Sequence, residues 1–136
     1  GEYAAAKPKA EAAGKQMASV NALTLIASAS ADRGKKAFKK CQSCHTTEKG
    51  GKNKVGPNLW GIVGKAKAST TGFKYSGALK GLGGNWTFAD LDAFLTKPKA
   101  FAKGTKMTFG GVKKPEDRAA LLALLRSLSA NPQPLP

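Results

Sequence analysis

The chain has 136 residues, which is enough for one domain and too few for two ordinary ones. Hydrophobic residues make up 41%, which suits a globular core, but aromatic residues make up only 7%, so a large apolar cofactor would help to fill the centre. The net charge of +15 implies an acidic partner, which could be nucleic acid, an anionic membrane surface or an acidic protein patch.

Residues 1–31 are predicted to form a linker or N-terminal arm ahead of the folded domain. Residues 1–18 are rich in Ala and Lys and show no apolar periodicity, which is typical of a flexible or partly helical tether. Residues 20–31 are mildly apolar, so they either pack on the domain or lead down from a membrane anchor. We expect the domain to cover residues 32–130 and a flexible tail to cover residues 131–136.

The helix with the strongest local signals is predicted over 87–96. Thr87 is a good N-cap, Asp90 lies in capping-box register three residues later, and Pro98 ends the helix. No segment has a convincing strand pattern, so the sequence predicts an all-α fold. The other predicted helices are 33–40 after an N-cap at Asp32, 76–82, and 115–128, which begins at Pro115.

Residues 41–45 read Cys-Gln-Ser-Cys-His, the C-x-x-C-H attachment signal for a c-type haem. Two thiols at this spacing can form thioethers with two vinyl groups on one porphyrin edge, and the next residue places an imidazole under the iron. A zinc site needs about four ligands, and because the chain has two Cys and one His, a further ligand would have to be a carboxylate. A thioredoxin-like motif would need a βαβ context, and a plain disulfide would not explain the histidine. We therefore expect one covalent haem.

The segment that follows, residues 46–77, is rich in glycine and predicts a long loop with little regular structure. A loop of this length inside one domain is expected only when it is functional. Wrapped around a haem, it would be packed by the cofactor.

The second axial position of the iron has several candidates. His45 is the only histidine, so the ligand would be Met17, Met107 or a lysine, or the position would be open. Met17 lies in the predicted tether. Met107 lies in a polar, Gly-flanked loop, Lys-Gly-Thr-Lys-Met-Thr-Phe-Gly-Gly, and is the favoured ligand. His/Met ligation raises the reduction potential and closes the iron to substrate, which favours electron transfer over catalysis.

Several motifs in order give the chain a resemblance to a known family. They are GKKAFKKCQSCH, KVGPNLWGIVG, GFKYSGAL, WTFADLDAFLTKPKAF, KGTKMTF and DRAALLALLRSL. Together they resemble the class I c-type cytochromes, meaning mitochondrial cytochrome c and its soluble and membrane-tethered bacterial relatives. The resemblance implies a small cytochrome c fold of about four or five short helices and Gly-rich loops wrapped around one covalent haem c.

The resemblance also implies a role for each matching residue. Cys41 and Cys44 would be the thioether anchors, and His45 and Met107 the iron ligands. The remaining cofactor-binding residues would be Pro57, whose carbonyl accepts a hydrogen bond from His45, and Tyr75 and Trp86, which would hydrogen-bond a haem propionate.

The chain departs from the mitochondrial pattern at three positions. Phe94 stands where a Tyr near the Met sulfur is usual, Lys65 replaces an Arg near a propionate, and Leu79 replaces an Asn. Gly34 and Phe38 match positions that would meet Leu121 and Leu124 where the first and last helices cross.

The resemblance implies a one-electron carrier and not an enzyme. It would shuttle electrons between respiratory or photosynthetic membrane complexes, or a periplasmic dehydrogenase, and a terminal oxidase or reductase. The alternative is a peroxidase-like enzyme if the methionine ligand is labile. We expect a monomer without nucleic-acid partners in the bacterial periplasm, either free after loss of a signal or tethered to the inner membrane by a missing anchor. Acidic patches of redox proteins would bind a basic ring of Lys39, Lys40, Lys54, Lys99, Lys103 and Lys106.

Overall fold

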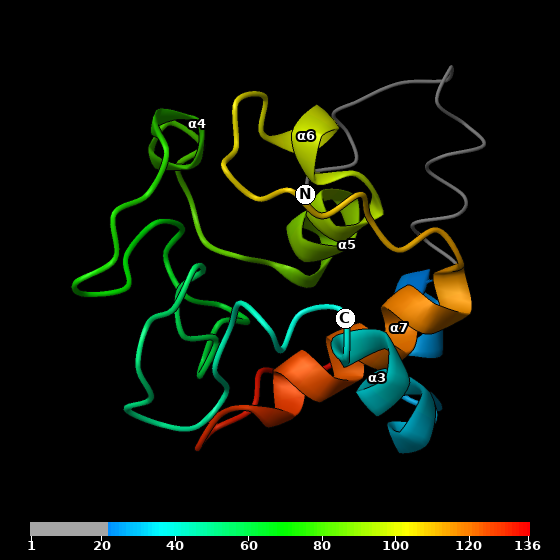
Figure 1. The fold of residues 1–136 in the computed structure, drawn as a ribbon. Coiled ribbons are helices and arrows are strands. Elements are labelled where there is room, and N and C mark those ends of the chain that lie inside the picture. The colour runs from blue at the N-terminus through cyan, green and yellow to red at the C-terminus, as the bar shows by residue number, and fades with distance from the viewer. Residues whose placement is uncertain (1–21) are drawn as a thin grey trace.

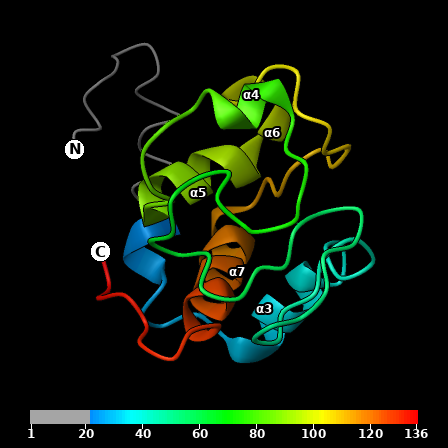
Figure 2. The same cartoon turned by 90° about the vertical axis from the view of Figure 1, so that its left-hand side faces the viewer.

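The computed structural model describes residues 22–136, and this part of the chain is all-α, as predicted. No strand occurs among these residues, and their one isolated β-bridge joins Ala66 to Asn85. The helices are α3 (Ala31–Phe38), α4 (Gly77–Lys80), α5 (Phe88–Thr96), α6 (Pro98–Phe101) and α7 (Pro115–Ser127). The long loops between α3 and α4 lie to one side of the helices, on the left in Figure 1 and toward the viewer in Figure 2.

Helices α3 and α7 cross in close contact, and α5 packs against both α6 and α7. The crossing depends on Gly34. A Cβ atom at this position would lie 2.7 Å from the Ala120 carbonyl oxygen and 3.6 Å from the Leu124 Cβ. The absence of a side chain therefore lets the two backbones approach, as the resemblance implied for Gly34 and Leu124. Phe38 and Leu121 belong to the same buried core.

The first of the predicted helices begins earlier than expected. Ser30, and not Asp32, is the N-cap of α3, because its side-chain oxygen accepts a hydrogen bond from Arg33 N at 3.2 Å. Asp32 lies in the first turn instead, where its charge favours the positive end of the helix. The helix also ends at Phe38, before the predicted Lys40.

The later helices follow the predicted signals more closely. The Thr87 side chain caps α5 by accepting a hydrogen bond from Asp90 N at 3.0 Å, and Ser76 caps α4, which is shorter than predicted. Pro98 ends α5, but it also occupies the first turn of the short helix α6, which was not predicted. Proline lacks an N–H to donate, so it suits the first position of a helix.

The apolar segment before α3 contributes to the core. Residues 22–25 are helical, and both Ala22 and Ile26 are buried. Ile26 belongs to the main hydrophobic cluster and Leu23 packs against it. The described part of residues 20–31 therefore packs on the domain. The tether predicted over residues 1–18 lies outside the described residues.

The C-terminal tail lies on the surface but is not free of the domain. Residues 131–136 are exposed, yet Arg126 Nε donates to the Gln133 carbonyl at 2.6 Å, and the Gln133 side chain lies against Gly64. Within residues 22–136, no helix has the length and apolar character needed to cross a membrane.

Candidate functional site

The Cys-x-x-Cys-His segment is a run of turns that continues from the end of α3. Cys41 N donates to the Phe38 carbonyl at 2.8 Å, and both Cys44 N and His45 N donate to the Cys41 carbonyl at 3.0 Å. These bonds bring the two thiols and the imidazole to the wall of one cavity. Both cysteines are free thiols in the structure, so the segment is not closed by a disulfide.

The His45 ring is fixed by the backbone that faces it. Its Nδ1 lies 2.7 Å from the Pro57 carbonyl oxygen, and Gly56 N donates to the Cys44 carbonyl at 2.8 Å. A carbonyl can only accept, so Nδ1 carries the proton in this bond and Nε2 keeps its lone pair. This is the tautomer that a metal ligand requires.

Burial lowers the pKa of His45 below its usual value, and the nearby Lys54 charge lowers it further, while the Pro57 bond opposes both. The neutral, ligating form is therefore favoured near neutral pH. Burial and the neighbouring Cys44 raise the pKa of the Cys41 thiol to about 11, against the opposing charge of Lys40. The Cys41 thiol is therefore protonated near neutral pH.

The cavity beside this segment has a volume of about 890 Å³, which lies at the upper end of the range for cofactor pockets. Its walls are mostly apolar and come from α3, the long loops, α4, α5, α7 and the loop after α6. All of the residues predicted to bind the cofactor line it, namely Cys41, Cys44, His45, Pro57, Tyr75, Trp86 and Met107.

Met107 lies in a loop that is anchored at both ends. At the near end, Met107 N donates to Thr105 Oγ1 at 3.2 Å. At the far end, Val112 N donates to the Leu95 carbonyl of α5 at 2.8 Å. Arg118 of α7 also donates to the Val112 and Lys113 carbonyls, at 3.0 and 2.8 Å.

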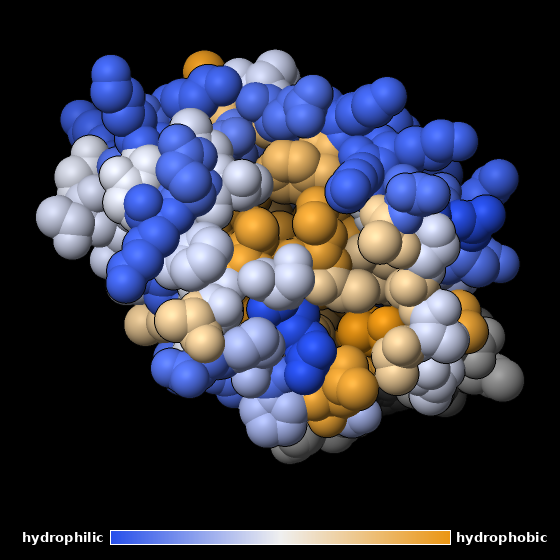
Figure 3. Space-filling view, turned by 90° about the horizontal axis from the view of Figure 1, so that it is seen from below, coloured by the Kyte–Doolittle hydropathy of each residue, from blue (hydrophilic) through white to orange (hydrophobic). Residues whose placement is uncertain are grey.

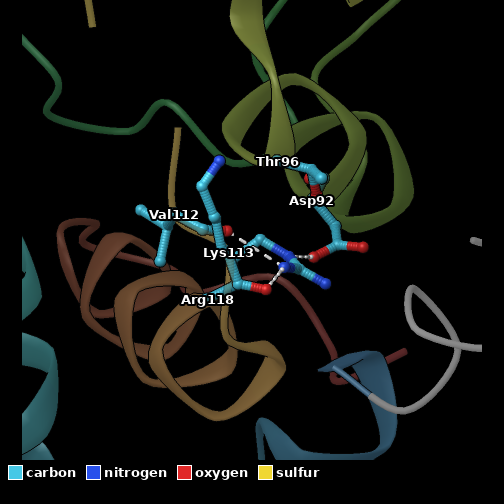
Figure 4. Close-up of polar contacts among 5 residues, drawn as sticks. All are labelled: Asp92, Thr96, Val112, Lys113 and Arg118. Carbon is cyan, nitrogen blue, oxygen red and sulfur yellow. Dashed lines mark hydrogen bonds and ion pairs between the residues drawn. The ribbon is translucent and has the colours of Figure 1, made fainter. Parts of the chain in front are cut away.

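Figure 4 shows how Arg118 joins this loop to both helices. Its guanidinium points from α7 toward α5, where Nε donates to Asp92 Oδ1 at 2.6 Å, while Nη1 faces the Val112 and Lys113 carbonyls. Both charged side chains are buried. The far end of the Met107 loop is therefore held by Arg118, whose position is in turn fixed by a buried ion pair with Asp92.

Two aromatic residues on the cavity wall are held in different ways. The Trp86 indole is buried against Phe94 and Phe101, with ring centroids 5.2 and 6.1 Å apart. The half-buried Tyr75 accepts a hydrogen bond at its hydroxyl from Thr70 N at 2.9 Å. Phe94 packs in this cluster without a polar group of its own, so no hydroxyl from this position reaches the cavity.

The lysines predicted to bind a partner are all exposed. Lys40, Lys54 and Lys106 also line the cavity, whereas Lys39, Lys99 and Lys103 do not. On the face drawn in Figure 3, apolar side chains gather around a central hollow and hydrophilic side chains surround them.

Two polar features were not predicted from the sequence. The Lys67 side chain is only 6% exposed, and its Nζ lies 2.6 Å from Asp90 Oδ2 and 5.2 Å from the Trp86 ring centroid. Thr70 lines the cavity, and its Oγ1 is buried without a hydrogen-bond partner among residues 22–136. Neither residue lies in a motif, so no sequence signal marked them.

The cavity fits a haem by its size, its apolar walls and its donor set. Two free thiols and a neutral imidazole stand together on one wall, and a thioether comes from the Met107 loop. The Thr70 hydroxyl is buried and has no hydrogen-bond partner among residues 22–136. A cofactor with polar groups could supply that partner. No cluster of three or more His, Cys, Asp or Glu side chains that could hold a metal ion directly occurs in residues 22–136.

Comparison with known proteins gives the same picture. The sequence model of the family named cytochrome c matches residues 31–129. A cytochrome c homolog of Bradyrhizobium diazoefficiens is 52% identical over 82% of this chain and 61% of its own length. Cytochrome c of Chlamydomonas reinhardtii is 46% identical over 72% of this chain and 88% of its own length.

A solved structure, cytochrome cH from Methylobacterium extorquens, superimposes with a TM-score of 0.66 at 41% identity, covering 71% of this chain and 97% of that one. The chain spans about three fifths of the length of its bacterial curated relatives. The match of the family model across most of the sequence is nevertheless direct: the chain belongs to the cytochrome c family, and its Cys-x-x-Cys-His motif has the spacing for that family's covalently attached haem.

Proposed function

We propose that this chain is a one-electron carrier and not an enzyme, with His45 and Met107 as the axial ligands of its haem. When bound, the haem supplies an iron that accepts and returns a single electron. The chain's own residues do the rest. Cys41 and Cys44 hold the haem covalently, the Pro57 carbonyl orients His45, and Tyr75 and Trp86 donate hydrogen bonds to its carboxylates.

One observation carries this proposal. His45 and Met107, which are far apart in the sequence, line the same cavity, and the Pro57 bond leaves His45 Nε2 as the free lone pair. An imidazole nitrogen and a thioether sulfur form the axial ligand pair that raises the reduction potential of a haem. With both axial positions of the iron filled, no position remains for a substrate. This arrangement suits electron transfer.

We expect Met107→Ala to abolish the sulfur-to-iron charge-transfer band of the ferric protein near neutral pH. The potential should fall by a sizeable part of the ~0.8 V range that axial ligands span in haem proteins, because a soft thioether favours the reduced iron. Met17→Ala, which alters the chain's other methionine, is the matched control and should leave both properties unchanged. Unchanged spectra in Met107→Ala would refute the ligand assignment.

The same spectra separate the carrier from the alternative, a peroxidase-like enzyme. Phe94 has no hydroxyl that could hydrogen-bond the Met107 sulfur. The absence of this bond is the one feature that would favour a labile methionine ligand. A high-spin ferric spectrum with rapid turnover of peroxide in the unaltered protein would decide for the enzyme. A low-spin spectrum with the sulfur band decides for the carrier.

We propose that the carrier docks through the basic ring defined above onto acidic patches of redox proteins in the bacterial periplasm, either free or tethered. All of these lysines are exposed, and Lys40, Lys54 and Lys106 stand at the cavity that would hold the haem. Electrostatic steering of this kind speeds encounter and is screened by salt.

Electron transfer from the reduced protein to an anionic acceptor, ferricyanide, should slow several-fold as ionic strength rises from the dilute range toward ~0.15 M. Lys106→Gln should lower the dilute-salt rate and flatten this dependence. Lys114→Gln removes an equal charge from an exposed position that does not line the cavity. It should therefore lower the dilute-salt rate less than Lys106→Gln does, and change the salt dependence less. Equal effects of the two variants would show that net charge, and not the ring, sets the rate.

A further inference from the structure

The hydroxyl of Thr70 is a polar atom that the protein buries and does not satisfy. Its Oγ1 is shielded from solvent and has no hydrogen-bond partner among residues 22–136, and Thr70 lines the cavity. Leaving a buried hydroxyl unpaired costs free energy, so proteins pair nearly all such groups. An unpaired hydroxyl on the wall of a binding cavity therefore points to a partner on the bound group.

The neighbouring Tyr75 hydroxyl is also free to donate a hydrogen bond. It accepts a hydrogen bond from Thr70 N at 2.9 Å. A phenol has one hydrogen to donate besides its acceptor lone pairs. Because the bond from Thr70 N fills an acceptor site, the phenolic hydrogen remains for a further acceptor. Thr70 and Tyr75 thus bring two hydroxyl donors to one part of the cavity wall.

The turn that carries Thr70 is fixed in place. On one side, Ser69 Oγ donates to the Ala66 carbonyl at 2.6 Å. On the other, Asn53 Nδ2 donates to the Thr71 carbonyl at 3.1 Å, which ties the turn to the loop that follows the Cys-x-x-Cys-His segment. These contacts fix the backbone from which the Thr70 side chain projects.

We propose that Thr70 is a further haem-binding residue, whose hydroxyl donates a hydrogen bond to a haem carboxylate beside Tyr75. The inference rests on the proposed function, in which that carboxylate is bound by this wall. A hydroxyl donor offsets part of the carboxylate's negative charge. Since negative charge near the iron favours the oxidised state, the donor raises the reduction potential.

The test is Thr70→Val in the haem-bound protein, because valine keeps the shape of threonine and loses only the hydroxyl. If the hydroxyl binds the carboxylate, the equilibrium constant for unfolding should rise about tenfold and the potential should fall. If the hydroxyl is unpaired, its removal should instead stabilise the protein and leave the potential unchanged. Urea unfolding and potentiometric titration therefore give opposite results for the two cases.

Two further variants complete the experiment. Thr70→Ser retains the hydroxyl and should keep the potential of the unaltered protein. Thr71→Val makes the same change at an exposed neighbour that does not line the cavity, and should change neither property. The proposal requires lower stability and lower potential together in Thr70→Val. A loss of stability alone would assign Thr70 a structural role, and a change in neither would mean that water satisfies the hydroxyl; both outcomes overturn the proposal.

The ferric sulfur-to-iron band, recorded for every variant, keeps this test separate from that of the proposed function. If the unaltered protein lacks the band, the His45 and Met107 assignment fails. The paired shifts in stability and potential would still report whether the Thr70 hydroxyl binds the haem.

Discussion

Replacing Arg118 with methionine is expected to lower the free energy of unfolding by about 3–5 kcal/mol. The Arg118 and Asp92 side chains are 2% and 0% exposed, and their atoms Nε and Oδ1 lie 2.6 Å apart. Without the guanidinium, the buried Asp92 carboxylate loses this counter-ion, and the Val112 and Lys113 carbonyls lose a donor. Urea unfolding of the haem-bound protein measures the effect.

The chain offers an exposed ion pair as a matched control. Arg33 Nε lies 3.6 Å from Asp117 Oδ1, and these side chains are 48% and 35% exposed. Arg33→Met should therefore cost less than about 1 kcal/mol. The double variant Arg118→Met with Asp92→Leu should recover much of the loss, since a buried pair can often be replaced by apolar residues. If Arg118→Met costs no more than Arg33→Met, the buried pair is not what ties α5 to α7.

Arg118→Met should also weaken the binding of Met107 to the haem iron. Arg118 holds the far end of the loop that carries Met107, through the carbonyls of Val112 and Lys113 (Figure 4). A loop freed at this end allows the methionine to leave the iron more readily. We expect the sulfur-to-iron band of Arg118→Met to disappear at a lower temperature than that of Arg33→Met.

How much of the fold was predictable depended on how local its signals are. The helix α5 was placed almost to the residue, because Thr87, Asp90 and Pro98 act within one turn of its ends. The start of α3 was misplaced, because Ser30 and Asp32 are both good caps and the sequence does not distinguish them. The short helix α6 was not predicted, because Pro98 is a stop signal for α5 and no other local signal marks a four-residue helix after it.

For the candidate site, too, the residues that could be predicted are those whose signals are local in sequence. The residues of the Cys-x-x-Cys-His segment and Pro57 lie close in sequence, so a motif was enough to bring them together. The ion pairs between distant parts of the chain were not predictable. Asp92 and Arg118 are 26 residues apart, Lys67 and Asp90 are 23 apart, and charged residues are usually exposed. With 23 Lys and Arg against 8 Asp and Glu, composition alone does not say which few are buried.

Gly56→Ala is expected to displace the His45 imidazole from its place in the cavity wall. A Cβ atom on residue 56 would lie 2.6 Å from His45 Nε2 and 2.8 Å from Nδ1, and it would collide with Cε1. The backbone at Gly56 has little freedom to move, because its N–H donates to the Cys44 carbonyl at 2.8 Å. The ring must rotate instead, and the Nδ1 contact with the Pro57 carbonyl is then lost.

The expected result is loss of the low-spin spectrum in a large fraction of the purified protein, with about 1–3 kcal/mol lower stability from overpacking alone. Gly77→Ala is the control, since nothing lies within 4 Å of a Cβ atom there and alanine is favoured over glycine in a helix such as α4. It should leave the spectrum unchanged and the stability equal or slightly higher. A Gly56→Ala protein with the original spectrum and stability would mean that His45 has room to turn while still binding iron, and the Pro57 contact would then not be what orients the ligand.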